Sequence, residues 1–265
     1  MGVYMFDGLT ALAGVIVGLI VGITGVGGGS LMTPLLVLLF GVAPQTAVGT
    51  DLLYAAITKM FGVGVHHRHD TVDWQVVGRL AAGSLPGAGL TLAWMHFSEV
   101  GQMKSGLIIS AVAVALLITA LGMVFKDALH RAGRNFRLVD ASRFKHLQPL
   151  LTVVAGLVLG VLVTLTSIGA GALGTVMLVY LYPLRMSPQR LVGTDLAHAI
   201  PLALIAGLGH LSLGNVDFRL LGNLLVGSIP GVLVGAFIST RAPLGFLRYA
   251  IAGVLGAVAV KLLAV

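Results

Sequence analysis

Two aspartates end the same short motif, one in each half of the chain. Asp51 and Asp195 each end a Val-Gly-Thr-Asp sequence within a largely apolar stretch. A carboxylate at membrane depth is a candidate proton carrier. It can equally brace a neighbouring loop, because an acidic side chain near a helix start is favourable in itself. The presence of the aspartate in both halves does not distinguish the two interpretations, because an aspartate that supports a loop would also be repeated. Both interpretations stay open.

Three histidines and one lysine follow the two aspartates within the same two predicted helices. His66 and His210 lie at the predicted C-terminal ends of the same two helices. Histidine titrates in the working pH range, so they are candidate gates or proton relays, and solvated helix caps are the alternative. His198 has no such counterpart, because Tyr54 takes the equivalent place, and this asymmetry makes His198 a candidate substrate contact. We predict Lys59 to be the one intramembrane lysine, near the inner end of its helix, where we expect it to snorkel.

Glycine is concentrated between two apolar runs, where four of the five residues from Gly25 to Gly29 are glycine. A phosphate-binding loop would need a Gly-Lys-Ser/Thr ending, and a dinucleotide-binding turn would need glycine in place of Ser30, so nucleotide binding is excluded. A second copy reads TSIGAGAL over residues 166–173. We predict that the chain turns inside the membrane at both breaks, where glycine permits the required dihedral angles.

The amides at the start of a helix carry partial positive charge and suit an anion. We therefore predict an anion site at the two breaks, near the bilayer midplane. The alternative is that the glycines only permit close helix packing. The predicted substrate-binding residues are Gly27, Gly28, Gly29, Ser30, Gly169, Ala170, Gly171, Ala172, Thr50, Thr194 and His198, and the proton-carrying or gating candidates are Asp51, Asp195, His66 and His210.

The composition places this chemistry in a membrane. Of the 265 residues, 57% are apolar and only 9% are charged, which is far less charge than a water-soluble surface carries. Uncharged runs such as 8–40, 105–125 and 150–184 reach or exceed the length of a span and lack the alternation of barrel strands. We predict an all-α polytopic membrane protein. The absence of cysteine excludes disulfides and thiolate metal sites, and no metal or cofactor is predicted.

An internal repeat organises the chain. Residues 187–196 echo residues 43–52, and Gly-Ser-Ile-Pro-Gly at 227–231 echoes Gly-Ser-Leu-Pro-Gly at 83–87. The first two apolar segments of each half are too short to cross a bilayer core of about 30 Å, so we predict a short broken or re-entrant helix pair. The apolar segments are 9–24, 31–42, 46–65, 75–95 and 104–125 in repeat 1 (9–125), and 150–166, 172–184, 188–209, 218–240 and 245–264 in repeat 2 (148–264), within one transport domain, 1–265.

The basic residues predict the orientation. The linker at 126–147 contains six lysines and arginines, which places it in the cytoplasm by the positive-inside rule. If each short pair enters and returns, most other arginines also fall on the cytoplasmic side. Each half then crosses an odd number of times, so we expect inverted repeats, a signature of secondary transporters. Inversion places Asp51 toward the outer side and Asp195 toward the inner side. Residues 126–146 are expected to lie against anionic lipid headgroups, and nucleic acid is not an expected partner.

The sequence GVGGGSLMTPLL with its Val-Gly-Thr-Asp element, and the second copy SIGAGALGTVML with another, resemble the sulfite exporter TauE/SafE family of membrane permeases over nearly the whole chain. The resemblance implies a multi-pass carrier of the bacterial inner membrane for a small sulfur-containing anion, such as sulfite, sulfoacetate or another organosulfonate. The second copy has Val176 where the first has Pro34, so equal contributions from the two halves are not expected.

Export of an anion needs no coupling ion in principle, because the negative cell interior drives anions outward. An anion channel would share the pathway but not the alternation between two access states, and saturable flux with counterflow would favour the carrier. An intramembrane enzyme is the weaker alternative, because neither an HExxH motif nor a serine–histidine or paired-aspartate signature stands out. We therefore expect a transporter rather than an enzyme.

Overall fold

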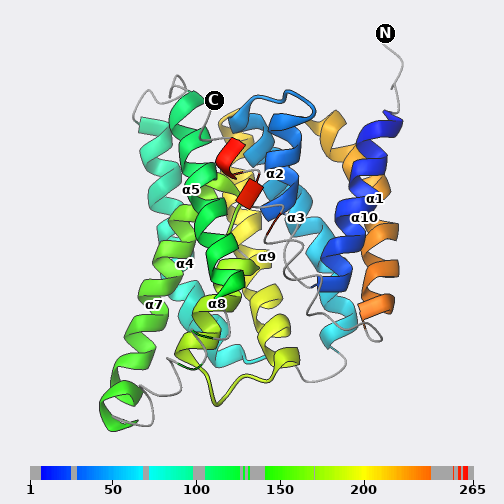
Figure 1. The fold of residues 1–265 in the computed structure, drawn as a ribbon. Coiled ribbons are helices and arrows are strands. Elements are labelled where there is room, and N and C mark those ends of the chain that lie inside the picture. Colours follow the sequence, from blue (N-terminus) through cyan, green and yellow to red (C-terminus); the bar gives the residue numbers. More distant parts are fainter. Residues whose placement is uncertain are drawn as a thin grey trace.

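The computed structural model describes residues 7–24, 29–67, 72–97, 105–125, 141–169 and 171–239, together with Ala128, Arg131 and short pieces between 253 and 261. All the regular secondary structure in these residues is helical, as predicted. The helices are α1 (Gly8–Thr24), α2 (Gly29–Leu38), α3 (Pro44–His67), α4 (Trp74–Phe97), α5 (Ser105–Val124), α7 (Ala141–Thr166), α8 (Ala172–Leu181), α9 (Pro188–Ser212) and α10 (Phe218–Ser239) (Figure 1).

Four of the described helices contain stretches long and apolar enough to cross a membrane. These are Trp74–Phe97, His146–Thr166, Arg190–Ser212 and Phe218–Gly235. Helix α7 begins at Ala141, inside the segment assigned to the linker, because residues 141–148 contain no glycine or proline that would end a helix. Most of the remaining linker and of the predicted last segment, 245–264, lies outside the described residues.

Aspartates cap the two long helices that follow the connections after α3 and α9. The Oδ1 atoms of Asp73 and Asp217 accept hydrogen bonds from amides in the first turns of α4 and α10, at 3.3 Å and 2.8 Å. The aromatic residues that follow, Trp74 and Phe218, are each 63% exposed. Both positions suit an amphipathic ring at the membrane interface.

Two tight helix pairs flank the centre of the molecule, and glycine makes both possible. A Cβ on Gly14 of α1 would lie 2.3 Å from the carbonyl oxygen of Leu224 in α10, and a Cβ on Gly156 of α7 would lie 2.2 Å from that of Leu80 in α4. One turn further, Gly18 meets Ser228 and Gly160 meets Ser84. Contacting positions rise together along both helices, so α1 runs parallel to α10 and α7 runs parallel to α4.

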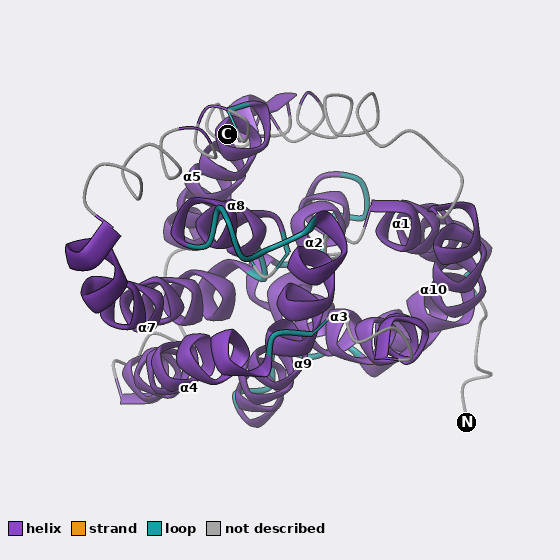
Figure 2. Cartoon of the chain, turned by 90° about the horizontal axis from the view of Figure 1, so that it is seen from below, coloured by secondary structure: helices purple, strands orange, loops and turns teal. Residues whose placement is uncertain are grey.

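Helices α3 and α9 lie between these two pairs, with α2 beside them (Figure 2). Gly207 of α9 packs on Leu53 of α3, whereas His210, further along α9, lies beside Gly49, earlier in α3. The two central helices are therefore antiparallel. They carry the aspartates of the repeated motif, so the packing at the centre decides what each carboxylate meets.

The two short helices lie in opposite halves of the molecule (Figure 1). The connection from α2 to α3 lies at the end where α1 begins, and the connection from α8 to α9 lies at the end where α7 begins. Helices α1 and α2 therefore both reach the same end of the molecule, and α7 and α8 both reach the opposite end.

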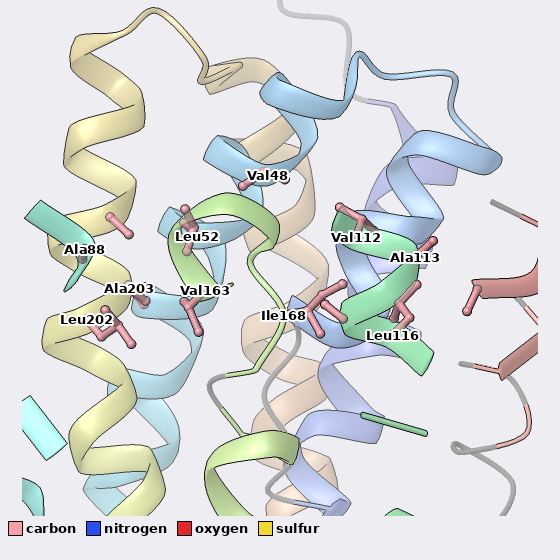
Figure 3. Packing of buried hydrophobic residues seen from close by; sticks show 14 of the residues in the cluster. Val48, Leu52, Ala88, Val112, Ala113, Leu116, Val163, Ile168, Leu202 and Ala203 are labelled. Carbon is pink, nitrogen blue, oxygen red and sulfur yellow. The ribbon is translucent and has the colours of Figure 1, made fainter. Parts of the chain in front are cut away.

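A buried apolar cluster joins α3, α4, α5 and α9 to the second break (Figure 3). Leu52 of α3, Leu116 of α5 and Leu202 of α9 are almost completely buried in it. Ile168, within the break between α7 and α8, belongs to the same cluster and is fully buried. The break is therefore anchored by packing in the protein interior, which holds the start of α8 in place.

Candidate functional site

Asp51 is fully buried in α3 and is held by α2. Its Oδ2 accepts a hydrogen bond from the Thr33 hydroxyl at 2.5 Å. Within the described part of the chain, Oδ1 has no hydrogen-bond partner. Ser167, in the break of the other half, lies close to this carboxylate, and its hydroxyl also lacks a partner among the described residues. Asp51 thus lies between the short helix of its own half and the break of the other.

Asp195 is equally buried but has different surroundings. Its carboxylate packs against the first turn of α8, because a Cβ on Gly174 would lie 2.2 Å from Oδ1. The hydroxyl of Thr175, the counterpart of Thr33, donates to the carbonyl oxygen of Gly171. The two aspartates of the repeat therefore differ in their partners, in line with the unequal contributions expected of the two halves.

The structure corrects the expectation for Lys59. The side chain does not snorkel: Lys59 is only 2% exposed. Its ammonium group interacts electrostatically with Asp195 and, more weakly, with Asp51. A buried ammonium is costly unless it is paired with opposite charge, and α3 and α9 supply that charge. The spacing of Lys59 eight residues after Asp51, within one stripe of a helix, was the sequence signal for this cluster.

The register of α3 against α9 gives the position of each charged residue along the helix axes. Leu53 lies beside Gly207, so at about 1.5 Å per residue the levels of Asp51 and Asp195 are about 20 Å apart along the helix axes. Lys59 lies between them, roughly 9 Å from the level of Asp195 and roughly 12 Å from that of Asp51. Each aspartate is nearer the end where its own helix begins, and a single lysine lies between the two levels.

His198 and Tyr54 occupy equivalent positions and face equivalent serines. The Nε2 of His198 lies 2.8 Å from the Ser84 hydroxyl, and Tyr54 lies close to Ser228. Both side chains are fully buried. His198 Nδ1 and the Tyr54 hydroxyl have no hydrogen-bond partner within the described ranges. His198 also interacts electrostatically with Lys59, which brings this substrate-contact candidate into the charged cluster.

Thr50 and Thr194 make a reciprocal pair of contacts between the halves. The hydroxyl oxygen of Thr50 accepts a hydrogen bond from the amide of Asp217 at 3.0 Å, and that of Thr194 accepts one from the amide of Asp73 at 2.9 Å. Each threonine thereby fixes the start of a long helix from the other half. The predicted substrate contact of these threonines stays a prediction.

His210 is buried rather than solvated. Its Nε2 lies 2.8 Å from the carbonyl oxygen of Thr164 and donates to it, because a carbonyl oxygen can only accept. This bond ties the end of α9 to the last turn of α7, just before the break. The side chain of His66 lies outside the described residues, so its role as a gate stays a prediction.

The second break has the backbone conformation predicted for it. Gly169 and Gly171 have φ angles of 124° and 131°, and Ser167 has a φ of 58°, all in the left-handed region that favours glycine. Helix α8 begins at Ala172 with no side-chain cap on its amides. In the first break, Gly27 and Gly28 lie outside the described residues, as does Ala170 in the second. Gly29 and Ser30 form the first turn of α2.

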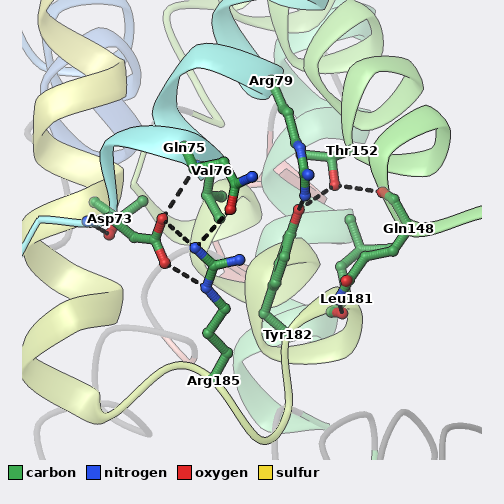
Figure 4. A network of polar contacts seen from close by, with 10 residues as sticks. Asp73, Gln75, Val76, Arg79, Gln148, Thr152, Leu181, Tyr182 and Arg185 are labelled. Carbon is green, nitrogen blue, oxygen red and sulfur yellow. Dashed lines mark hydrogen bonds and ion pairs between the residues drawn. The ribbon is translucent and has the colours of Figure 1, made fainter. Parts of the chain in front are cut away.

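A second polar network, which we did not predict (Figure 4), surrounds the connection from α8 to α9, which lies at one end of the molecule (Figure 1). Arg185, in the connection from α8 to α9, forms a bidentate ion pair with Asp73 at 2.6 Å and 2.8 Å and donates to Gln75 at 2.9 Å. Arg79 donates to the hydroxyl of Tyr182 at 3.2 Å. These contacts tie the start of α4 to the end of α8 and bring Arg79 and Arg185 to the same end of the molecule.

The described residues contain no group of three or more histidine, aspartate or glutamate side chains placed to hold a metal ion. The charged side chains at the centre instead form a cluster of two carboxylates and one ammonium group, lined by threonine, serine, tyrosine and histidine. Such a cluster can exchange protons and attract a small ion.

Comparison with known proteins identifies the family. The chain matches the family model described as Sulfite exporter TauE/SafE over residues 10–262. It is 42% identical over 249 residues to "Probable membrane transporter protein YjnA" of Bacillus subtilis (strain 168), covering 91% of this chain and 94% of the relative. It is 30% identical over 240 residues to "Probable membrane transporter protein YdhB" of the same organism, covering 89% and 91%. No solved structure matches the chain. The resemblance of the glycine motifs is confirmed: this chain is a membrane transporter that belongs to the sulfite exporter TauE/SafE family.

Proposed function

We propose that the protein is a secondary transporter that exports a small sulfur-containing anion, such as sulfite, sulfoacetate or another organosulfonate, across the bacterial inner membrane. The observation that carries this proposal is the break before α8. There the chain turns through left-handed glycines onto an uncapped helix start, beside a buried carboxylate. Helix starts of this kind favour anions, and the matching family is described as a sulfite exporter.

Alternating access between two inverted repeats is part of the proposal. The contacts of the helices support it: α1 and α3 run with α10, whereas α7 and α9 run with α4, and α3 opposes α9. These contacts support the proposed inversion, in which helices at matching positions of the two halves point in opposite directions. The reciprocal bonds of Thr50 and Thr194 have the same relationship. A rocking motion about α3 and α9 would present one break to each side in turn.

In this proposal the anion lies between the starts of α2 and α8, with Asp195 and His198 beside it and Asp51 further toward the other end of the molecule. The aspartates carry protons, and His66 and His210 lie at the ends of the same helices, where a gate is expected. The basic residues of 126–146 face anionic headgroups on the cytoplasmic side, which agrees with the shared position of Arg79 and Arg185 at one end of the molecule.

Flux measurement tests the function directly. Purified protein in liposomes should release trapped sulfite with saturable kinetics and show counterflow, while protein-free liposomes should not. Gly171→Val should abolish the flux, because valine is strained at a φ of 131°. Gly78→Val is the matched control, since a Cβ there meets nothing within 4 Å. Flux that does not saturate would favour a channel, and no flux of any sulfur oxyanion would contradict the proposal.

A further inference from the structure

Lys59 is a central charge to which the proposed function gives no role. It is buried in α3, with Asp51 on the same helix and with Asp195 and His198 on α9 within electrostatic range. The other half has Ala203 at the equivalent position, buried in the apolar cluster of Figure 3. The fold therefore accepts an apolar residue at this place. A buried lysine here costs free energy that packing does not require.

Asp195 lies at a place that suits an anion. Its carboxylate packs on the first turn of α8, with Oδ1 only 2.2 Å from where a Cβ of Gly174 would be. A helix start and an ammonium group both stabilise negative charge. Asp195 packs against the former and interacts electrostatically with the latter, so it occupies the electrostatic environment that an anionic substrate would favour.

We propose that Lys59 is the counter-ion of the transported anion, and that Asp195 is a competitor built into the chain that holds Lys59 until the carboxylate is protonated. The ligand is a small oxyanion such as a sulfonate. The inference rests on the proposed function and names Lys59 as the residue that neutralises the charge of the substrate. His198 Nδ1, which has no partner in the described part of the chain, offers a further hydrogen bond to an oxygen of the anion when Nε2 accepts from Ser84.

The charges of the cluster set the coupling. With both aspartates ionised, Asp51, Asp195 and Lys59 sum to one negative charge, and a bound monovalent anion would add a second in a buried place. A proton on Asp195 removes that excess and frees Lys59. Tyr54 on α3 and His198 on α9 are titratable side chains that interact with the charges of the cluster. Of the helices packed on α9, α8 contains Tyr180 in its last turn, and α4 contains Arg79 and His96 near its two ends. The titratable residues of α7 all lie in its first two turns. Helices α2 and α5 contain no titratable residue, and α10 contains only Arg219, in its first turn. One proton is therefore taken up with each monovalent anion.

Binding measurements on the purified full-length protein test this inference. The probes are methanesulfonate, whose single charge does not change over a neutral-to-acidic pH series, and sulfite at one fixed pH. Wild-type affinity for methanesulfonate should rise as the pH falls. Lys59→Met should weaken binding by about tenfold or more, the range of a lost charge-assisted hydrogen bond, and Lys59→Arg should restore part of it. Lys261→Met, which removes an exposed lysine, should change nothing.

Asp195→Asn provides the second arm, which does not depend on the folding of the Lys59 variants. Removing the competitor should tighten methanesulfonate binding at neutral pH by roughly fivefold or more and should flatten the pH dependence. Weaker methanesulfonate binding by Asp195→Asn, or wild-type affinity in Lys59→Met, would overturn this inference but leave the proposed function intact. Wild-type protein that binds neither probe would overturn the proposed function together with it.

Discussion

A pair of glycine-to-alanine substitutions offers the sharpest test of the helix packing that positions the site. A Cβ on Gly156 of α7 would lie 2.2 Å from the carbonyl oxygen and 3.0 Å from the carbonyl carbon of Leu80 in α4. Ordinary contact needs at least 3.4 Å, so the two backbones must separate by about 1 Å in a close-packed interior. No flexible side chain can absorb this shift, because the obstacle is the main chain of α4.

The expected loss combines two opposing effects. Overpacking of a tight interior costs about 1–3 kcal/mol, and alanine regains up to about 1 kcal/mol over glycine in a helix. Because the obstacle is main chain, the overpacking cost falls at the upper end of this range, about 2–3 kcal/mol, so Gly156→Ala should lower the free energy of unfolding by about 1–2 kcal/mol. Gly78 on α4 is exposed, and a Cβ there meets nothing within 4 Å. Gly78→Ala should show only the effect of the higher helix propensity of alanine, which raises the free energy of unfolding by up to about 1 kcal/mol.

Unfolding in detergent, followed by the fluorescence of the two tryptophans, measures both variants against the wild-type protein. Because Gly14 meets Leu224 at 2.3 Å in the equivalent pair, Gly14→Ala should match Gly156→Ala in sign and approximate size. Gly156→Ala at or above wild-type stability would refute the argument, since the α4–α7 contact would then tolerate a side chain. Destabilisation by Gly78→Ala of the same size would refute it too, because the loss would reflect glycine itself and not the contact.

Two further predictions concern Asp51 and the orientation. Thr33→Val removes the 2.5 Å hydrogen bond to Asp51 and should cost about 1–3 kcal/mol in unfolding experiments, because a buried carboxylate loses its partner. Thr175→Val, which loses only a bond to a carbonyl oxygen in its own helix turn, should cost less, and equal losses would count against a special role of Asp51. Asn135→Cys introduces the only cysteine into a chain that has none. This cysteine should react with a membrane-impermeant thiol reagent only after the membrane is opened. Labelling in intact cells would contradict the proposed orientation.

The sequence by itself determined the helices, the breaks and the duplication. Hydropathy and the helix-ending effect of proline and glycine are local properties, so α3 and α9 closely match the predicted segments 46–65 and 188–209. For the same reason, Gly169 and Gly171 adopt the left-handed conformation that the glycine-rich break predicts. The repeated motif also located Asp51 and Asp195 as a buried pair. The family followed from the same motifs, because they preserve their order and spacing along the chain.

Only the tertiary structure decided what each polar group meets. Lys59 looked like a snorkelling lysine because its own helix does not reveal that α9 brings Asp195 toward it. Thr50 and Thr194 accept hydrogen bonds from helix starts of the opposite half. Asp51 and Asp195 have different partners although both end a Val-Gly-Thr-Asp motif. The physical reason is that hydropathy is a property of each segment by itself, whereas electrostatic pairing joins residues of segments that are far apart in the sequence. The pairing depends on the register and direction of helices far apart in sequence, which close glycine contacts set and no single segment encodes.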